Sequence, residues 1–277
     1  MIEVAQLLGI PFLACLMMAA ILGYFGHHVL KREIIFVDIA LAQVAAVGSI
    51  FAHVVFAVHD NSLAAFGCSL GCVLVAAAFY AYVRQAIVQI SLEAVIGVSY
   101  AIAAAAALFL VGVAVGGHIH IQKILAGSLL WAQWSDLGTS LLVFSAIGAC
   151  LYLVRKPLAK ISEGDRQGGA AGPRAIALDF LFYALLGVVI TLAVRIAGIV
   201  VVFSYLVMPA TAATILCQHQ TVRLIITWLV AFLASLAGLL FAYWLDFSVG
   251  PAIALFLGIA LIIAGGIGQL RQRFTLA

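Results

Sequence analysis

Residues 94–116 read AVIGVSYAIAAAAALFLVGVAVG, which is 23 consecutive residues without a charged side chain. At about 1.5 Å of rise per residue, an α-helix of this length crosses the roughly 30 Å hydrocarbon core of a bilayer. The rest of the chain has the same character, because 67% of its 277 residues are hydrophobic and only 8% are charged. Too few polar side chains remain to cover a soluble globule. The composition therefore predicts an all-α, polytopic integral membrane protein.

Eight further apolar segments bring the expected number of transmembrane helices to about nine, within a range of about eight to ten. The nine predicted spans are 6–30, 34–58, 62–83, 94–116, 137–154, 176–196, 198–217, 222–245 and 250–268. The only long hydrophilic stretch is Arg155 to Arg174, where Gly, Pro and mixed charge predict a cytoplasmic loop or a short surface helix. No fixed-period repeat is evident, so residues 1–277 are expected to form one transmembrane domain with a cytoplasmic loop at about 155–174.

The basic residues predict the orientation of the chain. With the N-terminus outside, eleven of the thirteen Lys and Arg fall at cytoplasmic ends, and only Lys123 and Arg195 fall on the other side. We therefore expect the N-terminus outside and the C-terminus inside. The net charge of +3 comes from residues between apolar runs, so no nucleic-acid partner is indicated. His27, His28 and His219 are expected at the cytoplasmic membrane surface.

Motifs for ATP hydrolysis or metalloprotease chemistry are absent from the sequence. It contains neither the phosphate-binding pattern G-x-x-x-x-G-K-[ST] nor H-E-x-x-H, so we do not expect the chain to be an enzyme. A passive channel stays open as an alternative, although the sequence shows none of the repeated pore loops or charged rings that channels usually have. The five cysteines lie in apolar stretches and are interpreted as small hydrophobic residues.

Three segments carry a resemblance to a known family. Arg195 to Thr214 (RIAGIVVVFSYLVMPATAAT) is similar to an Arg-x-x-Gly motif followed by an apolar run into Pro-Ala-x-x-Ala. Leu92 to Val98 (LEAVIGV) resembles an acidic-x-x-Ile-Gly stretch, and Leu125-Ala126-Gly127 with the later Ser135-Asp136-Leu137 resembles Leu-Phe-Gly before a Ser/Asp-Leu segment. Together these segments resemble the permeases of zinc and manganese ABC importers, the ABC-3 family.

The resemblance implies a permease subunit in the cytoplasmic membrane of a bacterium, which moves a divalent metal ion of the zinc or manganese class by alternating access. The implied partners are a cytoplasmic ATP-binding subunit, a second permease copy as a homo- or heterodimer, and an extracytoplasmic substrate-binding protein. No covalent cofactor is expected, because the metal is cargo and ATP binds the partner. The connection that carries Arg84, Gln85 and Glu93 is expected to dock the ATPase, with the loop at 155–174 as a second candidate.

The second helix departs from the family. Phe36-Val37 and Gly48 match, but an ungapped alignment places Ile39 and Gln43 where the family has the Asp and His of its Asp-Ala-Leu-Ser-His-x-x-x-Pro-Gly motif. No register restores both ligands, since a shift that recovers Asp38 loses the histidine. Asp38 and Gln43 are therefore expected to line the path, although Asp38 also suits a helix N-terminus and Gln43 suits helix packing. Two alternatives stay open: the importer carries a metal chelate or a small organic molecule, or the chain is a membrane protein without a transport role.

Pro209 lies inside the seventh apolar run, where it is expected to kink or split the helix. Thr211 or Thr214 would then satisfy a freed carbonyl, and Met208 and Pro209 would border the substrate path. In the third run Gly67 and Gly71 share a helix face, which predicts close packing against another helix.

Several polar residues map to the extracytoplasmic side. Imidazoles with a carboxylate hold borderline cations, so these residues are candidates for a transient metal site at the outer mouth. The alternative is that they are ordinary polar residues in wet loops. The candidates are His53, His59, Asp60, His118 and His120.

Overall fold

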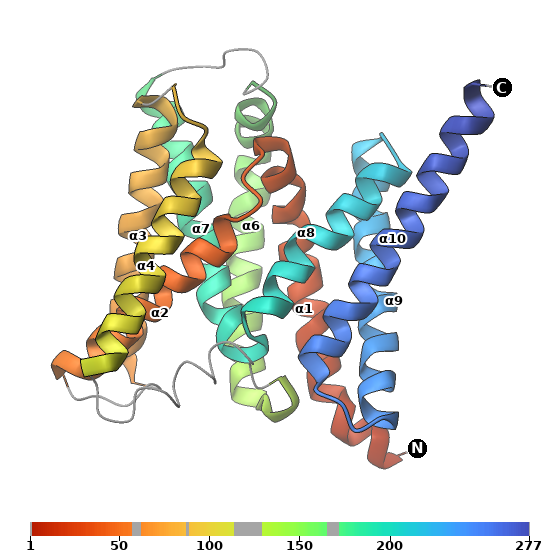
Figure 1. The fold of residues 1–277 in the computed structure, drawn as a ribbon, viewed down its shortest axis with the longest axis horizontal. Coiled ribbons are helices and arrows are strands. Elements are labelled where there is room, and N and C mark those ends of the chain that lie inside the picture. The colour runs from red at the N-terminus through yellow and green to blue at the C-terminus, as the bar shows by residue number, and fades with distance from the viewer. Residues whose placement is uncertain (1, 57–61, 87–88, 114–128, 165–171, 277) are drawn as a thin grey trace. The chain divides into compact units, whose positions relative to one another are not determined.

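A computed structural model describes residues 2–56, 62–86, 89–113, 129–164 and 172–276 of the chain (Figure 1). Within these ranges, nine helices are long and apolar enough to cross a membrane, which confirms the predicted all-α membrane fold. The helices are α1 (Ile2–Arg32), α2 (Val37–Phe56), α3 (Leu63–Ala86), α4 (Leu92–Val113), the short 3₁₀ helix η1 (Leu129–Trp131), α6 (Trp134–Gly164), α7 (Pro173–Ala197), α8 (Ile199–Leu216), α9 (Gln220–Trp244) and α10 (Val249–Leu276).

Helix α6 continues about ten residues beyond the predicted end of its span. It passes through Pro157 and ends at Gly164, so the first half of the predicted hydrophilic loop is helical. Leu, Ala, Lys and Ile after the proline are adequate helix formers, and Leu158 is 1% exposed. Burial of Leu158 helps to offset the backbone hydrogen bond that Pro157 removes.

The chain divides into two compact units. Unit 1 comprises Met1–Leu30, Ala126–Ser145 and Ile196–Ala277, and unit 2 comprises Lys31–Leu125 and Ala146–Arg195. Unit 1 therefore holds most of α1, the start of α6, and α8 to α10, whereas unit 2 holds α2 to α4, the rest of α6 and most of α7. That residues 1–277 act as a single domain stays a prediction.

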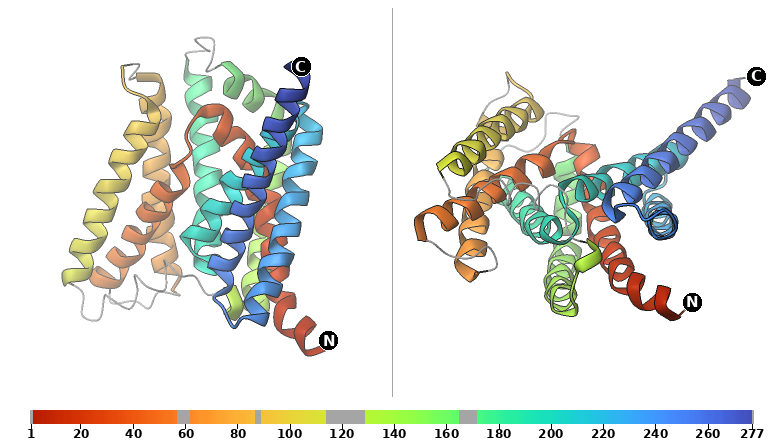
Figure 2. Two further views of the ribbon diagram at one scale, coloured as in Figure 1. Left: turned by 45° about the vertical axis from the view of Figure 1, so that its right-hand side comes forward. Right: turned by 60° about the horizontal axis from the view of Figure 1, so that its bottom comes forward.

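In unit 2, α2 packs against both α3 and α4, which touch each other much less (Figure 2). Gly48 of α2 lies at the crossing with α3, where a Cβ atom would lie only 2.7 Å from the Cys68 carbonyl oxygen and from the Ser69 Cα. Real Cβ atoms do not come so close to backbone atoms, so this position requires glycine. Gly48, which matches the last glycine of the family motif, is thus needed for the packing of α2 on α3.

The prediction for Gly67 and Gly71 is wrong as far as the described part of the chain is concerned. No other described residue comes within 4 Å of the Cβ position of either glycine, because α3 packs on α2 through the neighbouring face that carries Cys68 and Ser69. Residues 67–71 also read GCSLG, which matches the nucleophile pattern G-x-S-x-G by letters. Ser69 is buried within a continuous helix and not on a strand-to-helix turn, so it cannot present a nucleophile.

In unit 1, α8 packs against α9 and α10, and α9 packs against α10. The joint between α7 and α8 is the single residue Gly198, whose φ of 83° is a conformation that other residues rarely adopt. Gly198 is also the glycine of the Arg-x-x-Gly motif. That part of the motif is therefore explained by backbone geometry, since the one residue that joins the two helices has a positive φ.

Candidate functional site

Asp38 lies in the first turn of α2 and is 2% exposed. Its Oδ1 atom has no hydrogen-bond partner among the residues that the structure describes. A buried carboxylate oxygen that accepts no hydrogen bond is costly, and a cation offers one way to satisfy it. The position at a helix N-terminus also favours the negative charge.

Glu93 lies in the first turn of α4, and its carboxylate is tied to the start of α2. Its Oε1 atom accepts a hydrogen bond of 3.2 Å from the backbone N–H of Phe36. Its Oε2 atom is buried and, within the described ranges, accepts none. The start of α2 is therefore flanked by two carboxylates of unit 2, those of Asp38 and Glu93, each with one oxygen that could accept a ligand.

Gln43 is half-buried on the same helix as Asp38, five residues further along. At 3.6 residues per turn, the two side chains point about 140° apart around the helix axis. Because they face different directions, they cannot easily bind one ion together. If both contact cargo, they contact it at different positions along the path.

Pro209 is buried in α8, which runs unbroken from Ile199 to Leu216, so the proline does not split the helix. The carbonyl that it leaves without an intrahelical donor belongs to Tyr205. Thr211 and Thr214 instead donate to the carbonyls of Val207 and Ala210, each at 2.8 Å. The expected compensation by these threonines is therefore wrong, and Met208 beside the proline is half-buried.

The outer metal site stays a prediction. His53 lies in the last turn of α2 and is half-buried, whereas His59, Asp60, His118 and His120 lie outside the described residues. Among the residues that are described, no group of three or more His, Cys, Asp or Glu side chains is close enough to hold a metal ion.

Two histidines expected at the membrane surface take part in packing. His28 is 8% exposed and lies beside the ring of Tyr24, with a centroid separation of 5.1 Å. The Nε2 atom of His27 lies 2.9 Å from the Thr227 hydroxyl oxygen on α9. The surface prediction is wrong for His28 and incomplete for His27, while His219 is exposed as expected.

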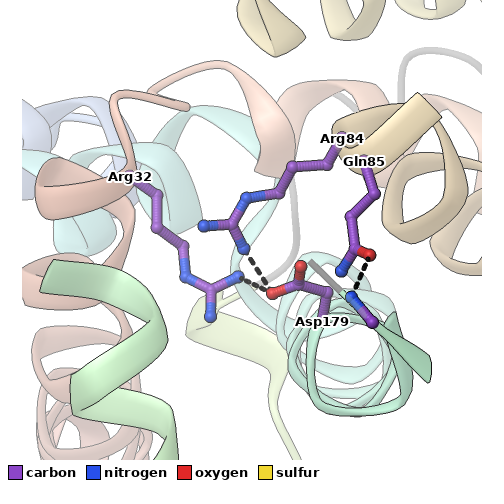
Figure 3. Close-up of polar contacts among 5 residues, drawn as sticks. Arg32, Arg84, Gln85 and Asp179 are labelled. Carbon is purple, nitrogen blue, oxygen red and sulfur yellow. Dashed lines mark hydrogen bonds and ion pairs between the residues drawn. The ribbon is translucent and has the colours of Figure 1, made fainter. Parts of the chain in front are cut away.

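The three residues expected to dock an ATPase all make contacts within unit 2. Arg84 forms an ion pair with Asp179 of α7, and the side-chain oxygen of Gln85 accepts a 3.4 Å hydrogen bond from the backbone N–H of Gly172 (Figure 3). Glu93 accepts the Phe36 hydrogen bond described above. Ile90, at 54% exposure, is the large apolar side chain that the described part of this connection presents outward.

Asp179 is the residue that sequence reasoning missed. Its Oδ1 atom binds Nη1 of Arg84 and also Nη1 of Arg32 at 2.9 Å, so the last turns of α1 and α3 meet at α7 (Figure 3). A signal was present, because Asp179 is a lone carboxylate inside an apolar run of spanning length. Such a residue usually has a partner or a function.

Comparison with known proteins places nearly the whole chain in one family. Residues 5–266 match the profile of the family described as ABC 3 transport family. The "Manganese transport system membrane protein MntC" of Halalkalibacterium halodurans is 24% identical over 255 residues, which covers 90% of this chain and 85% of that protein. The "Manganese import system permease protein ScaB" of Streptococcus parasanguinis is 25% identical over 163 residues, or 59% of this chain and 58% of that protein.

A solved structure shares the fold. The structure of "PsaBC from Streptococcus pneumoniae in complex with Fab" superposes with a TM-score of 0.75 at 19% identity, and the match covers 95% of this chain and 93% of that one. The helix order described above is thus found in an experimentally determined protein.

Proposed function

The chain belongs to the ABC 3 transport family, and from that premise we propose that it is the permease subunit of an importer for a divalent metal ion of the zinc or manganese class. As a membrane-spanning member of a transport family it is a transport component and not an enzyme. The observation that carries the proposal is the family match over residues 5–266, and the names of two relatives support manganese as cargo.

The proposed mechanism is alternating access by an assembly of several subunits. Two permease copies form the path between them, a cytoplasmic subunit binds and hydrolyses ATP, and an extracytoplasmic protein delivers the metal. ATP on the partner supplies the free energy, and this chain supplies the path. The assembly lies in the cytoplasmic membrane of a bacterium.

The first test concerns the ATPase partner. The sequence has no phosphate-binding motif, so the purified chain should hydrolyse no ATP, whereas co-expression with the cognate ATPase should give a stable complex that does. Copurification measures the association of the two proteins, and phosphate release measures ATP hydrolysis. Hydrolysis by the chain alone, or failure of the two proteins to associate, would argue against the assignment.

The path is proposed to include Asp38 and Gln43 of α2 and Met208 and Pro209 of α8. Asp38 supplies a carboxylate oxygen that suits manganese-class ions, and Gln43 supplies an amide oxygen where the family has an imidazole. Since the two α2 side chains point in different directions, they would meet the ion in succession. The carboxylate and imidazoles of His53, His59, Asp60, His118 and His120 are proposed to hold the metal transiently at the outer mouth.

The ATPase is proposed to dock at the connection between α3 and α4, with the segment 155–174 as a second site. The contacts within unit 2 are made by Arg84, Gln85 and Glu93. The proposed role of these three side chains is therefore to position the connection and not to touch the ATPase. The exposed Ile90 is then the side chain that the connection offers to the partner.

A metal chelate or small organic cargo is the second candidate. The observation that favours it is Gln43, because an amide is a weaker ligand for a bare zinc-class ion than the imidazole that it replaces.

The proposed orientation, with the N-terminus outside, has its own test. In a variant without native cysteines, Gln167→Cys should react with a membrane-impermeant thiol reagent only from the cytoplasmic side, and Asn61→Cys only from the outer side. The five native cysteines, which lie in helices or at a helix end, are free thiols that could also react with the reagent. Their removal leaves the introduced cysteine as the site of labelling. The opposite pattern of labelling at either position would overturn the orientation.

A further inference from the structure

Asp179 binds two arginines through a single carboxylate oxygen. Arg32 comes from the last turn of α1 and Arg84 from the last turn of α3, and both donate to Oδ1 (Figure 3). Among the described residues, two guanidinium groups thus share one carboxylate in a mostly buried site. Such a cluster is poor as simple packing, because hydrophobic side chains of similar volume often stabilise a fold at least as well.

The two arginines are held differently. The Arg32 side chain is 0% exposed, and its guanidinium carbon lies 4.1 Å from the centroid of the Phe182 ring, which is a close cation–π contact. The Arg84 side chain is 9% exposed and reaches the cluster from the end of a helix. Arg32 is therefore enclosed, whereas Arg84 borders solvent.

This asymmetry determines which ion pair can open. If Arg84 turns outward, its guanidinium regains water and Asp179 keeps Arg32, so no buried carboxylate is left without a cation. If Arg32 were to leave, it would lose the Phe182 contact and would need a path through packed side chains. Breaking a buried pair is costly mainly when a charge is left uncompensated, so opening at Arg84 is the cheaper event.

The same turn of α3 makes a second described contact with the start of α7. The hydrogen bond from the Gly172 N–H to Gln85 is 3.4 Å long, near the upper limit for such a bond. Both contacts join the last turn of α3 to the start of α7. The connection that is proposed to dock the ATPase leaves α3 directly after this turn.

We propose that Asp179 is a positioning residue with one permanent and one releasable arginine partner, and that release of Arg84 lets the cytoplasmic end of α3 move during the transport cycle. The role in transport rests on the proposed function, whereas the asymmetry between the two arginines belongs to the chain alone. In this cluster, Arg32, Asp179 and Phe182 keep their contacts with one another while Arg84 leaves.

The first test follows hydrogen exchange in the purified full-length chain. Amides of residues 82–86 should exchange faster than those of residues 29–32, and Arg84→Gln should accelerate exchange at 82–86 by roughly 10-fold without changing 29–32. Arg84→Lys should stay close to wild type, because one ammonium group still pairs with Asp179. Equal acceleration at both helix ends, or no change at either, would overturn the proposal.

The second test measures coupling in the complete complex. In proteoliposomes supplied with radiolabelled Mn²⁺ or Zn²⁺, Arg84→Gln should lower the ratio of metal taken up to ATP hydrolysed by at least roughly 10-fold, while the melting temperature changes little. Arg84→Lys should restore the ratio to within about threefold of wild type. Arg273→Gln, at an exposed arginine in the last turn of α10, is the matched control and should change nothing.

The outcomes separate the two proposals. An unchanged ratio in Arg84→Gln, or a parallel loss of uptake and melting temperature, would show that the cluster serves stability alone and would overturn its coupling role. If the wild-type complex takes up neither metal, the proposed function fails. The exchange experiment then still decides whether Arg84 is the releasable partner of Asp179.

Discussion

Replacing Asp179 with alanine is expected to lower the free energy of unfolding by about 3–5 kcal/mol, which is the largest stability effect that the structure predicts. The substitution leaves the guanidinium groups of Arg32 and Arg84 side by side without the carboxylate that both bind. Arg32 has no exposed surface through which to recover water. Thermal or chemical unfolding of the purified chain in detergent measures the loss.

Two comparisons make this prediction specific. Asp136→Ala is the matched control, because Asp136 is exposed and caps a helix start through a 3.2 Å hydrogen bond from the Gln133 N–H, so its loss should cost about 1 kcal/mol. Adding Arg84→Gln to Asp179→Ala removes one of the two guanidinium groups that had bound the carboxylate. The double variant should therefore recover part of the lost free energy of unfolding. If Asp179→Ala costs no more than Asp136→Ala, the cluster does not have the described energetic role.

The second large effect is expected in transport and not in stability. Asp38→Ala removes the carboxylate that we place on the cargo path, so ATP-driven metal uptake should fall by at least roughly 10-fold. Stability should change by no more than about 1 kcal/mol, because alanine removes the burial cost of the Oδ1 atom, which accepts no hydrogen bond within the described chain, and this offsets the loss of a favourable charge at the helix start. Assembly with the ATPase should therefore survive.

Gln43→His tests the other half of the path. An imidazole at this position should increase zinc and manganese binding if Gln43 meets the bare ion, because nitrogen suits these metals better than an amide oxygen does. Asp136→Ala again serves as the control, because it removes an exposed carboxylate that is not among the residues proposed to line the path. Uptake by Asp38→Ala equal to wild type would place the cargo elsewhere, and a Gln43→His variant that binds metal no better would favour a chelate.

The sequence was sufficient for the fold because the bilayer imposes a simple rule on it. Long uncharged runs such as 94–116 must form helices, since no water is present to satisfy an open backbone. Nine spans followed directly from this rule, and the described part of the chain bears them out. Helix ends were less predictable: α6 extends through Pro157, a local helix-breaking signal whose cost the burial of Leu158 helps to offset.

Side-chain partners were harder to predict, because hydropathy and charge position do not specify tertiary contacts. Arg32 and Arg84 were counted only as basic residues on the cytoplasmic side, and nothing in their spacing indicated that both bind Asp179. The resemblance did locate Gly48 and Gly198, whose roles in helix packing and in the joint before α8 emerged only from the structure.

The central claim is that this chain carries a metal ion across a membrane when a partner hydrolyses ATP. It is tested most directly by reconstituting the wild-type chain with its cognate ATPase and binding protein in vesicles and measuring uptake of radiolabelled Mn²⁺ and Zn²⁺ with and without ATP. The account predicts uptake that requires ATP and the binding protein and that exceeds uptake by Asp38→Ala at least roughly 10-fold. An assembled, ATP-hydrolysing complex that accumulates neither metal would contradict it.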